Sequence, residues 1–312
     1  MVSICIPTYK KPEFVKRLLD SIQSQTVKDI EVIISDDSPT NEIGDLANKY
    51  KDVMNLKYIH HSPALKSPKN WNFALSAGSG EYLMLIHQDD WLASITSIES
   101  YLKVFENDNI DFVYSKNTAL TQDGRIVTLQ GLKYLMTNLE KFPYRLVIAD
   151  VIGPPSNVMI RREIHEKIQY DENFIWLVDV DYYVRLLKAN LNYKYIDNHL
   201  ITIGLHKDQT TEYCQKNPHI MIKENIWFAK KIEKFIFGDL IAYDYFWRLI
   251  RNYRIDSIEK LCSNNLMLTE IPAFIKSIIS FQKYLPYKFL KIGLFSKLFM
   301  FISYVTGLLR GV

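Results

Sequence analysis

The stretch YLMLIHQDDWL, residues 82–92, places two adjacent carboxylates directly after a run of five apolar residues. A run of this length that is apolar on both faces is typical of a strand inside a parallel sheet covered by helices. Asp89 and Asp90 come just beyond the run, and His87 precedes them. Because open α/β sheets bind ligands beyond the carboxyl ends of their strands, the stretch predicts the fold class and the position of the site together.

The chain before this stretch repeats the same alternation of strands and helices. Apolar runs of strand length alternate with segments of helical spacing, at 3–6, 12–25, 31–35, 42–50, 56–60 and 69–77. The alternation predicts an α/β fold with a mostly parallel sheet. The glycine-rich patterns GxGxxG and GxxxxGK[ST] are absent from the first half of the chain, which argues against a dinucleotide-binding dehydrogenase and a P-loop enzyme.

The composition excludes some functions and indicates the cellular compartment. The net charge of +3 over 312 residues is too small to indicate nucleic-acid binding. Three distant cysteines without metal-ligand spacing predict free thiols in a reducing compartment. The N-terminus has no apolar segment of signal length, so we expect a cytoplasmic protein. A compositional change near residue 215 predicts two regions, 1–215 and 216–312.

Two neighbouring carboxylates at the end of a strand repel each other unless a cation neutralises them. Hard oxygen ligands suit Mg²⁺ or Mn²⁺, which keep other coordination positions for water and substrate phosphates. Asp89 and Asp90 therefore indicate a divalent metal and a phosphate-bearing substrate. The alternative is that they cap a helix that begins near Trp91.

Four segments, taken in order, resemble the family 2 glycosyltransferases, an inverting group with the GT-A fold that includes enzymes of bacterial surface polysaccharides. The segments are SICIPTYKKPEFVKRLLDSIQSQT, EVIISDDS, NWNFALSAGSGEYLMLIHQDDWL and WLVDVDYYVRLL, and the resemblance runs from residue 2 to about residue 210. It implies a GT-A fold, a Rossmann-like sheet flanked by helices. It also implies a divalent metal, a nucleotide-diphosphate sugar as donor, with a UDP-sugar favoured, and a glycan hydroxyl as acceptor.

The resemblance assigns nucleotide contacts to three parts of the chain. Pro7, Thr8 and Tyr9 match the first strand end, which lies against the nucleotide. Asp37, with Asp36 beside it, matches the acidic residue that contacts the base. Lys66 and Asn70 fall in a segment that contributes nucleotide or diphosphate contacts.

The metal and ribose motif of the family, DxDD, matches His87 to Asp90 with histidine at its first position. By the resemblance, Asp89 and Asp90 bind the metal, and His87 and Asp89 contact the nucleotide. His206 matches a family histidine that reaches the diphosphate or the metal, and neutral imidazole suits such a role.

The string VDVD at 178–181 resembles the family's ED-x-D, with Val178 in place of the glutamate. The resemblance implies that Asp179 is the catalytic base, since an inverting transfer needs one carboxylate to take the proton of the acceptor hydroxyl. Asp181 competes for this role, although a pair with Arg185 at i+4 would make it structural. We therefore assign the chemistry to Asp179.

The region 216–312 is expected to be helical, and it is rich in aromatic and basic residues. After Glu270 the chain has no acidic residue and six basic ones. The longest uncharged stretch, 298–309, is too short to span a membrane, which takes about 20 residues. The apolar spacing of Leu294, Leu298 and Phe301 predicts an interfacial helix on an anionic membrane, at the inner face of the plasma membrane. A helix pair that covers the sheet, or a dimer contact, is the alternative.

A membrane-bound acceptor, such as a polyprenyl-diphosphate-linked glycan, would account for this tail. Two rival functions are a catalytically lapsed protein that binds sugar nucleotides or glycans, and a nucleotidyltransferase. The substitutions at His87 and Val178 favour the first rival. A nucleotidyltransferase would carry a glycine-rich basic loop after the first strand, and residues 7–11 contain no glycine.

Overall fold

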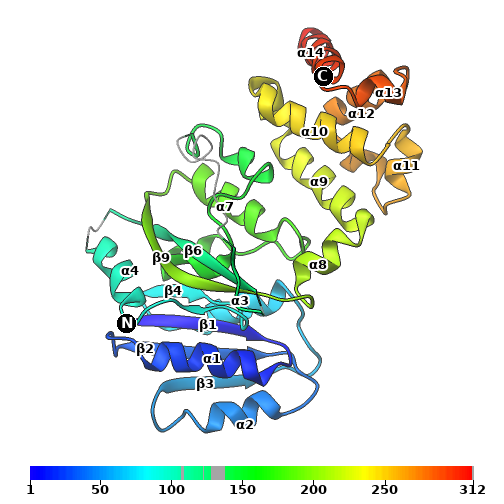
Figure 1. Ribbon diagram of the computed structural model, residues 1–312. Coiled ribbons are helices and arrows are strands. Elements are labelled where there is room, and N and C mark those ends of the chain that lie inside the picture. The colour runs from blue at the N-terminus through cyan, green and yellow to red at the C-terminus, as the bar shows by residue number, and fades with distance from the viewer. Residues whose placement is uncertain (107–108, 122, 128–137, 311–312) are drawn as a thin grey trace.

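The computed structural model describes residues 1–106, 109–121, 123–127 and 138–310. Within this part of the chain, nine strands form one sheet in the order β3-β2-β1-β4-β8-β6-β9-β5, with β7 paired to β6 (Figure 1). The strands are β1 Val2–Thr8, β2 Ile30–Asp36, β3 Asn55–His60, β4 Tyr82–Leu85, β5 Trp91–Leu92, β6 Phe112–Thr121, β7 Ile126–Val127, β8 Val158–Arg161 and β9 Tyr193–Leu205.

The four N-terminal strands are parallel, and their register sets the functional edge of the sheet. Thr8 at the end of β1 pairs with Asp36 at the end of β2, and Cys5 pairs with Leu85 at the end of β4. β8 runs antiparallel between β4 and β6, and β9 returns parallel to β6. The carboxyl ends of β1, β2 and β4 therefore lie side by side, as the sequence predicts.

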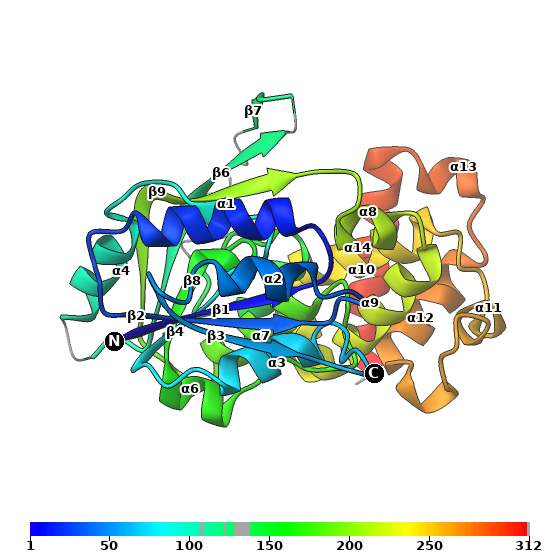
Figure 2. The same ribbon diagram turned by 90° about the horizontal axis from the view of Figure 1, so that it is seen from below.

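Helices cover both faces of the sheet, and each face has its own core. α1 (Pro12–Gln23), α2 (Glu42–Asn48) and α4 (Ser97–Phe105) pack on one face through residues such as Leu18, Ile43 and Tyr101. α3 (Lys69–Ser76), α6 (Arg162–Lys167) and α7 (Val178–Lys188) pack on the other, as Figure 2 shows. The predicted strands and helices before residue 90 are all confirmed. The helix that we considered near Trp91 is wrong, since Trp91 begins the short strand β5.

The chain after β9 is helical, as predicted, and it stands beside the sheet near α7 (Figure 1). The longer helices are α9 (Pro218–Ile232), α10 (Leu240–Asn252), α12 (Ala273–Gln282) and α14 (Gly293–Arg310). Shorter ones are α8 (Thr210–Gln215), α11 (Ile258–Cys262) and α13 (Tyr287–Leu290), with 3₁₀ turns η3 (Glu233–Gly238) and η4 (Leu268–Glu270). In the described part of the chain, no helix combines the length and the apolar character needed to cross a bilayer.

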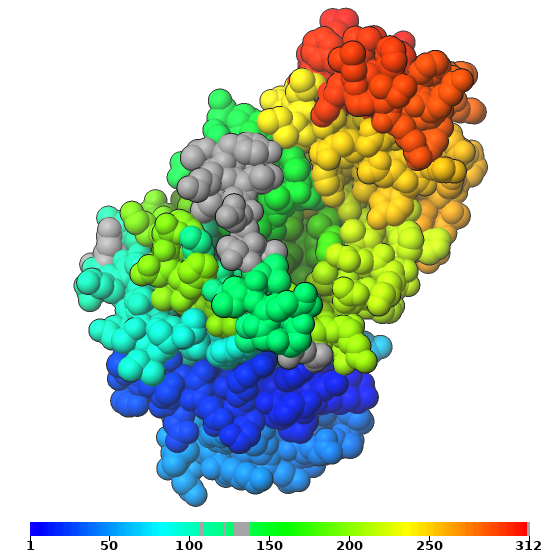
Figure 3. Space-filling view, viewed as in Figure 1, coloured from blue at the N-terminus to red at the C-terminus, as the bar shows by residue number. Residues whose placement is uncertain are grey.

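The two regions share one hydrophobic core, although α8 ends where the composition changes. Buried residues of this core run from Cys5 in β1 to Met300 in α14. A buried ion pair adds to the contact, because Arg145 binds both carboxylate oxygens of Asp239 at 2.6 and 2.9 Å. Figure 3 shows a recess on the surface where the green and the yellow-green parts of the chain meet.

Candidate active site

The ends of β1 and β2 are joined through the carboxylate of Asp36, which has no exposed surface. Its Oδ1 accepts hydrogen bonds from the hydroxyls of Thr8 at 3.0 Å and Ser38 at 2.6 Å, and its Oδ2 accepts one from Tyr58 at 2.8 Å. A buried carboxylate needs such donors to offset the loss of hydration. Asp36 and Thr8 therefore fix the two strand ends and the turn that follows β2.

The neighbouring Asp37 holds the loop that carries Lys66. Its carboxylate accepts the backbone N–H groups of Leu65 at 2.9 Å and Lys66 at 2.7 Å. Asn70 is buried, and its amide binds Ser35 twice: it accepts from the hydroxyl at 2.5 Å and donates to the carbonyl at 3.0 Å. Asp37 and Asn70 thus shape the edge of the sheet, while the side chain of Lys66 is exposed there.

Gln88 joins the end of β1 to the loop after β4. Its side-chain amide accepts the N–H of Tyr9 at 3.0 Å and donates to the carbonyl of Tyr9 at 3.1 Å. Pro7 is buried within β1, whereas the ring of Tyr9 is 53% exposed. These two hydrogen bonds keep Tyr9 beside the loop that starts at His87. The sequence analysis did not predict this role for Gln88.

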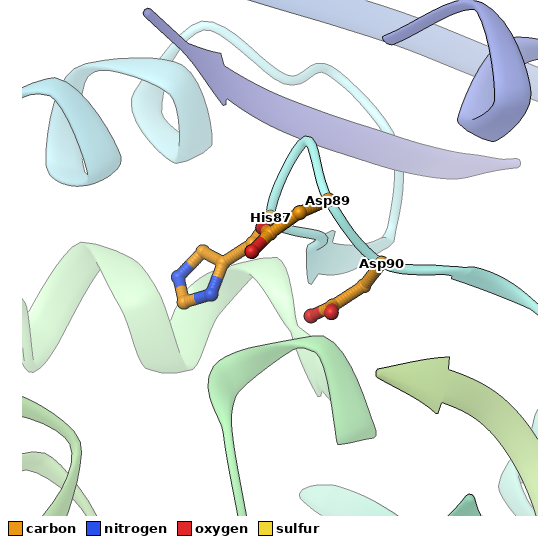
Figure 4. Close-up of side chains that lie close together, drawn as sticks. All are labelled: His87, Asp89 and Asp90. Atoms are coloured by element: carbon orange, nitrogen blue, oxygen red, sulfur yellow. The ribbon is translucent and has the colours of Figure 1, made fainter. Parts of the chain in front are cut away.

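His87, Asp89 and Asp90 form a group whose ligand atoms all lie within 4.8 Å of one another (Figure 4). His87 stacks against Trp71, with ring centroids 4.7 Å apart, and burial lowers its pKa, so the imidazole is neutral at pH 7. Its Nε2 is buried and has no hydrogen-bond partner in the described part of the chain. A neutral imidazole nitrogen without a donor and two carboxylates are a donor set that fits a divalent ion.

The two carboxylates have opposite electrostatic environments. Burial and the charge of Asp89 raise the pKa of Asp90, although its oxygens accept from the Ser156 hydroxyl at 2.5 Å and the Gly204 N–H at 3.1 Å. Burial acts in the same direction on Asp89, but the hydrogen bond from His206 and the two neighbouring histidines outweigh it and lower the pKa. A cation at this position would allow both carboxylates to be charged.

His206 lies against Asp89 and contacts it through a hydrogen bond. Its Nε2 is 2.9 Å from the Oδ2 of Asp89, and its Nδ1 accepts the N–H of Asp208 at 3.2 Å. With Nδ1 as the acceptor, Nε2 carries the proton and donates to the carboxylate. In this arrangement His206 orients Asp89, and direct metal ligation by His206 stays a prediction.

Arg17 in α1 supports the same loop from behind. Its guanidinium donates to the carbonyl of Asp89 at 2.6 Å and lies 3.8 Å from the ring centroid of Trp91. A side chain on Gly204 would approach that carbonyl to 2.3 Å, so only glycine fits there. Sequence reasoning missed Arg17 and Gly204, because each contacts the loop from a distant part of the chain.

Asp179 lies in the first turn of α7, where its Oδ1 accepts the N–H of Val180 at 2.8 Å. Burial raises the pKa of Asp179 to about 6, a value suited to a general base near neutral pH. Asp181 is instead held in ion pairs with Arg185 at 2.8 Å and Lys231 at 2.6 Å. The predicted pair with Arg185 is confirmed, and it makes Asp181 structural.

The segment before α7 is anchored by Glu224 in α9. The buried carboxylate of Glu224 accepts the N–H groups of Ile175, Trp176 and Leu177 at 2.8, 2.8 and 2.9 Å. Asp179 follows two residues after the last of them. The helical region thus helps to position the candidate base, which sequence reasoning did not predict.

Asp150 is a second carboxylate beside Asp179 and was also missed. Its Oδ1 accepts the N–H groups of Ile152 at 3.0 Å and Gly153 at 3.1 Å, so it starts a tight turn. Burial and the charge of Asp179 raise the pKa of Asp150. The segment ADVIGPPSN had no feature that linked it to residues thirty positions later.

A family model described as glycosyl transferase family 2 matches residues 3–169, more than half of the chain. An uncharacterized glycosyltransferase of Methanocaldococcus jannaschii is 26% identical over 209 residues, 64% of this chain and 69% of its own length. The GalNAc(5)-diNAcBac-PP-undecaprenol beta-1,3-glucosyltransferase of Campylobacter jejuni is 24% identical over 294 residues, 89% of this chain and 93% of its own. The chain spans only 27% of the chondroitin synthase of Pasteurella multocida, at 24% identity over 265 residues and 84% of this chain.

Solved structures share the fold. Staphylococcus aureus TarS 1–349 in complex with UDP-GlcNAc superimposes with a TM-score of 0.60 at 16% identity, over 98% of this chain and 92% of that one. The mannosyltransferase PcManGT from Pyrobaculum calidifontis, in complex with GDP-Man and Mn²⁺, gives a TM-score of 0.56 at 13% identity, over 98% and 86%. These comparisons confirm the family resemblance drawn from the motifs and the GT-A fold.

Proposed function

The chain belongs to glycosyl transferase family 2, and from that premise we propose that it transfers a sugar from a nucleotide-diphosphate donor to a glycan hydroxyl, with inversion. The observation that carries the proposal is the pairing of a metal-binding group with a separate carboxylate poised as a base. Trp71 lies between the metal-binding group and Asp179. Its ring contacts the rings of His87 and Tyr170, and the charge of Asp179 raises the pKa of Tyr170. Leaving-group stabilisation and nucleophile activation thus come from adjacent elements.

A divalent ion, Mn²⁺ or Mg²⁺, would be held by His87, Asp89 and Asp90 and would supply charge neutralisation at the departing nucleotide diphosphate. Asp179 takes the proton of the acceptor hydroxyl as its oxygen bonds to the anomeric carbon. The sugar–phosphate bond breaks on the opposite face, and the electron pair leaves with the nucleotide. Attack opposite to the leaving group inverts the anomeric configuration. General-base help of this kind contributes about 10² to 10⁴ in rate.

A UDP-sugar is the donor that we propose. TarS was crystallised with UDP-GlcNAc, which supports a uridine nucleotide, whereas PcManGT was crystallised with GDP-Man. At the nucleotide edge of this chain, Tyr9 and Lys66 have exposed side chains, and Asp37 retains carboxylate lone pairs beside its two backbone bonds. These three residues are the proposed nucleotide contacts. Pro7, Thr8 and Asp36 support them from within the sheet, and Asn70 supports them from α3.

The proposed acceptor is a polyprenyl-diphosphate-linked glycan in cell-surface polysaccharide assembly. The Campylobacter relative, which aligns with 89% of this chain, carries an undecaprenol-linked acceptor in its name. A lipid-linked acceptor confines the reaction to a membrane surface. We therefore propose that the protein is peripheral on the inner face of the plasma membrane and docks through its C-terminal region.

The packing of α14 supports this attachment. The face of α14 that packs on the protein consists of Ser296, Met300, Ser303 and Gly307, of which only one residue is large and apolar. Both hydroxyls bind α10: Ser296 accepts from Trp247 at 3.1 Å, and Ser303 is 2.8 Å from the Tyr243 hydroxyl.

The opposite side of α14 is apolar and open. Leu294 and Leu309 are 80% and 82% exposed, and Leu298, Phe301, Ile302 and Leu308 are exposed as well. A helix that simply covered a core would turn its large apolar residues inward. Since the chain after Glu270 has only basic charges, the apolar face and its flanking lysines fit the interface of an anionic bilayer.

A nucleotide-release assay tests the transferase proposal. Wild type and Asp179→Asn are incubated with UDP-, GDP- and dTDP-sugars in Mn²⁺, Mg²⁺ or EDTA, with and without GlcNAc-diphosphoundecaprenol. We expect metal-dependent release from one donor that is lost in Asp179→Asn. Tight nucleotide binding without turnover under every condition would favour the lapsed binding protein, which the substitutions at His87 and Val178 support.

A further inference from the structure

One loop touches both halves of the site. Residues 150–157 begin at Asp150, beside Asp179, and end at Ser156 and Asn157, in the 3₁₀ turn η2 (Pro155–Asn157). The hydroxyl of Ser156 donates to Asp90 at 2.5 Å and accepts the N–H of His87 at 3.0 Å. The loop is therefore fixed to the metal-binding group at one end and presents a carboxylate near the base at the other.

The turn at the Asp150 end is built to hold that carboxylate in place. Gly153 has a φ of +85°, and a side chain there would approach the amide of Asn157 to 2.5 Å. That amide donates to the carbonyl of Ile152 at 3.1 Å. With Oδ1 of Asp150 bound to two backbone N–H groups, the carboxylate has one fixed orientation.

Asp150 and Asp179 are arranged alike. Each carboxylate has its Oδ1 bound to backbone N–H groups, and for the second oxygen of either we find no hydrogen-bond partner among the described residues. The groups that face Asp179 come from several elements: Asp150 from the loop, Glu224 from α9, Tyr170 from the segment after α6 and Tyr183 from α7. No cation is among these groups, and the second oxygens of the two half-buried carboxylates are open to a hydrogen-bond donor on a ligand.

We propose that Asp150 is a second carboxylate of the acceptor site, which accepts a hydrogen bond from a hydroxyl adjacent to the attacking one while Asp179 takes the proton of the attacking hydroxyl. The proposal rests on the transferase function above. Two neighbouring hydroxyls of a sugar ring present two donors on one edge, and two carboxylate oxygens on separate elements match them. The acceptor class is then a glycan terminus with a vicinal diol.

Buried aromatic rings pack behind the pair and hold the elements that carry it. Tyr170 stacks on Tyr182 with centroids 4.1 Å apart, and the edge of Trp71 meets Tyr170 at 5.4 Å. The hydroxyls of Tyr182 and Tyr183 are buried without a partner in the described part of the chain.

Asp150→Asn tests the proposal with the fold kept, because the amide oxygen still accepts the two N–H groups of the turn. With GlcNAc-diphosphoundecaprenol as acceptor, we expect kcat/KM to fall about 10- to 100-fold, the range for a lost hydrogen bond to a charged group. The fall should lie mainly in the acceptor KM, and donor hydrolysis by water should persist. Asp52→Asn, which removes the same charge from an exposed turn, is the matched control.

Donor hydrolysis separates this role from a structural one. Asp150 is not among the groups that raise the pKa of Asp179, so the acid limb of the hydrolysis pH profile should stay near pH 6 in Asp150→Asn, as in Asp52→Asn, while the acceptor KM rises in Asp150→Asn alone. An Asp150→Asn enzyme with a wild-type acceptor KM would overturn the proposal. Loss of hydrolysis and transfer alike, as complete as in Asp179→Asn, would also overturn it, because Asp150 would then be the base.

A titration measures the coupling of the two carboxylates without turnover. The charge of Asp179 raises the pKa of Asp150, so the ¹³Cγ signal of Asp150 in ¹³C-aspartate-labelled protein, identified by its loss in Asp150→Asn, should titrate at lower pH in Asp179→Asn than in wild type. An unchanged titration would refute the pairing even if no donor is found. Absence of turnover in wild type with a shifted Asp150 titration would instead contradict the transferase function alone.

Discussion

Glu224→Ala should weaken both the fold and the activity, because one carboxylate in α9 holds three backbone N–H groups before the candidate base. Hydrogen bonds to a charged group contribute about 1.5–3 kcal/mol each. Ile175 is partly exposed, so water can replace the hydrogen bond to its N–H group. The hydrogen bonds to Trp176 and Leu177 then account for the loss in unfolding free energy, about 3–6 kcal/mol. Burial raises the pKa of Glu224, and its removal recovers part of that cost, so we expect a loss of about 2–4 kcal/mol.

Urea unfolding at pH 7 measures the change in unfolding free energy, and nucleotide release measures the effect on Asp179. Glu224→Gln keeps one acceptor oxygen, which serves Trp176 and Leu177, so its loss should be clearly smaller. Glu212→Ala removes an exposed glutamate of α8 that pairs with Lys216, and such pairs contribute about 0.3–0.5 kcal/mol. Should Glu224→Ala and Glu212→Ala unfold at the same urea concentration, the anchoring role of Glu224 would be refuted.

Further outcomes follow from the site and the tail. Because burial raises the pKa of Asp179 to about 6, kcat/KM should be constant above pH 7 and fall with decreasing pH through about 6; a profile flat to pH 5 would contradict the base assignment. Asp179→Asn removes the base and should be inactive. Because burial disfavours the charged form of Asp179, the variant should nevertheless have a higher Tm than wild type at pH 7, and this gain in Tm should vanish at pH 4, where Asp179 is protonated. EDTA should abolish nucleotide release and Mn²⁺ restore it, while His206→Ala, which removes the imidazole donor to Asp89, should raise the Mn²⁺ concentration for half-maximal activity about 10- to 100-fold. Leu294→Glu with Leu309→Glu should release the protein from anionic liposomes in a sedimentation assay, whereas Val53→Glu, on an exposed turn, should not; equal pelleting of both would exclude α14 as the anchor.

Substitution is the better test of the tail, because the structure shows what truncation would remove. Leu290 and Met300 are buried in the shared core, and Ser296 and Ser303 bind α10. Deletion of residues 280–312 would expose that core, so a loss of liposome binding could then result from misfolding as well as from loss of the membrane anchor. The exposed leucines of α14 can change without this cost, since the side chains point to solvent.

The part of the fold that the sequence predicted is the part governed by local pattern. The first four strands and three helices were predicted because apolar runs and turn residues report on their own segments. The helix near Trp91 failed for a tertiary reason. The loop after Asp90 pairs Trp91 with Thr202 of β9, and no local signal reports a partner more than a hundred residues away.

The same distinction divides the residues of the site. Asp89, Asp90 and Asp179 lie in motifs that a single segment displays. Arg17 and Asp150 reach the site from other elements, and Glu224 acts on the backbone of a distant segment. Such contacts depend on packing between helices and loops, which periodicity does not encode.

The departures from the family motif at His87 and Val178 favoured a catalytically lapsed binding protein. The structure weakens that argument at both positions. At His87, the buried Nε2, which has no partner among the described residues, lies beside Asp89 and Asp90, so the histidine adds a donor to the group that we propose binds the metal. At Val178, the side chain is 3% exposed and belongs to the shared core, where a charged glutamate would be costly. A lapsed site has no need of a carboxylate whose pKa is near 6 or of a loop fixed between metal-binding group and base. The retention of both favours an enzyme that still turns over.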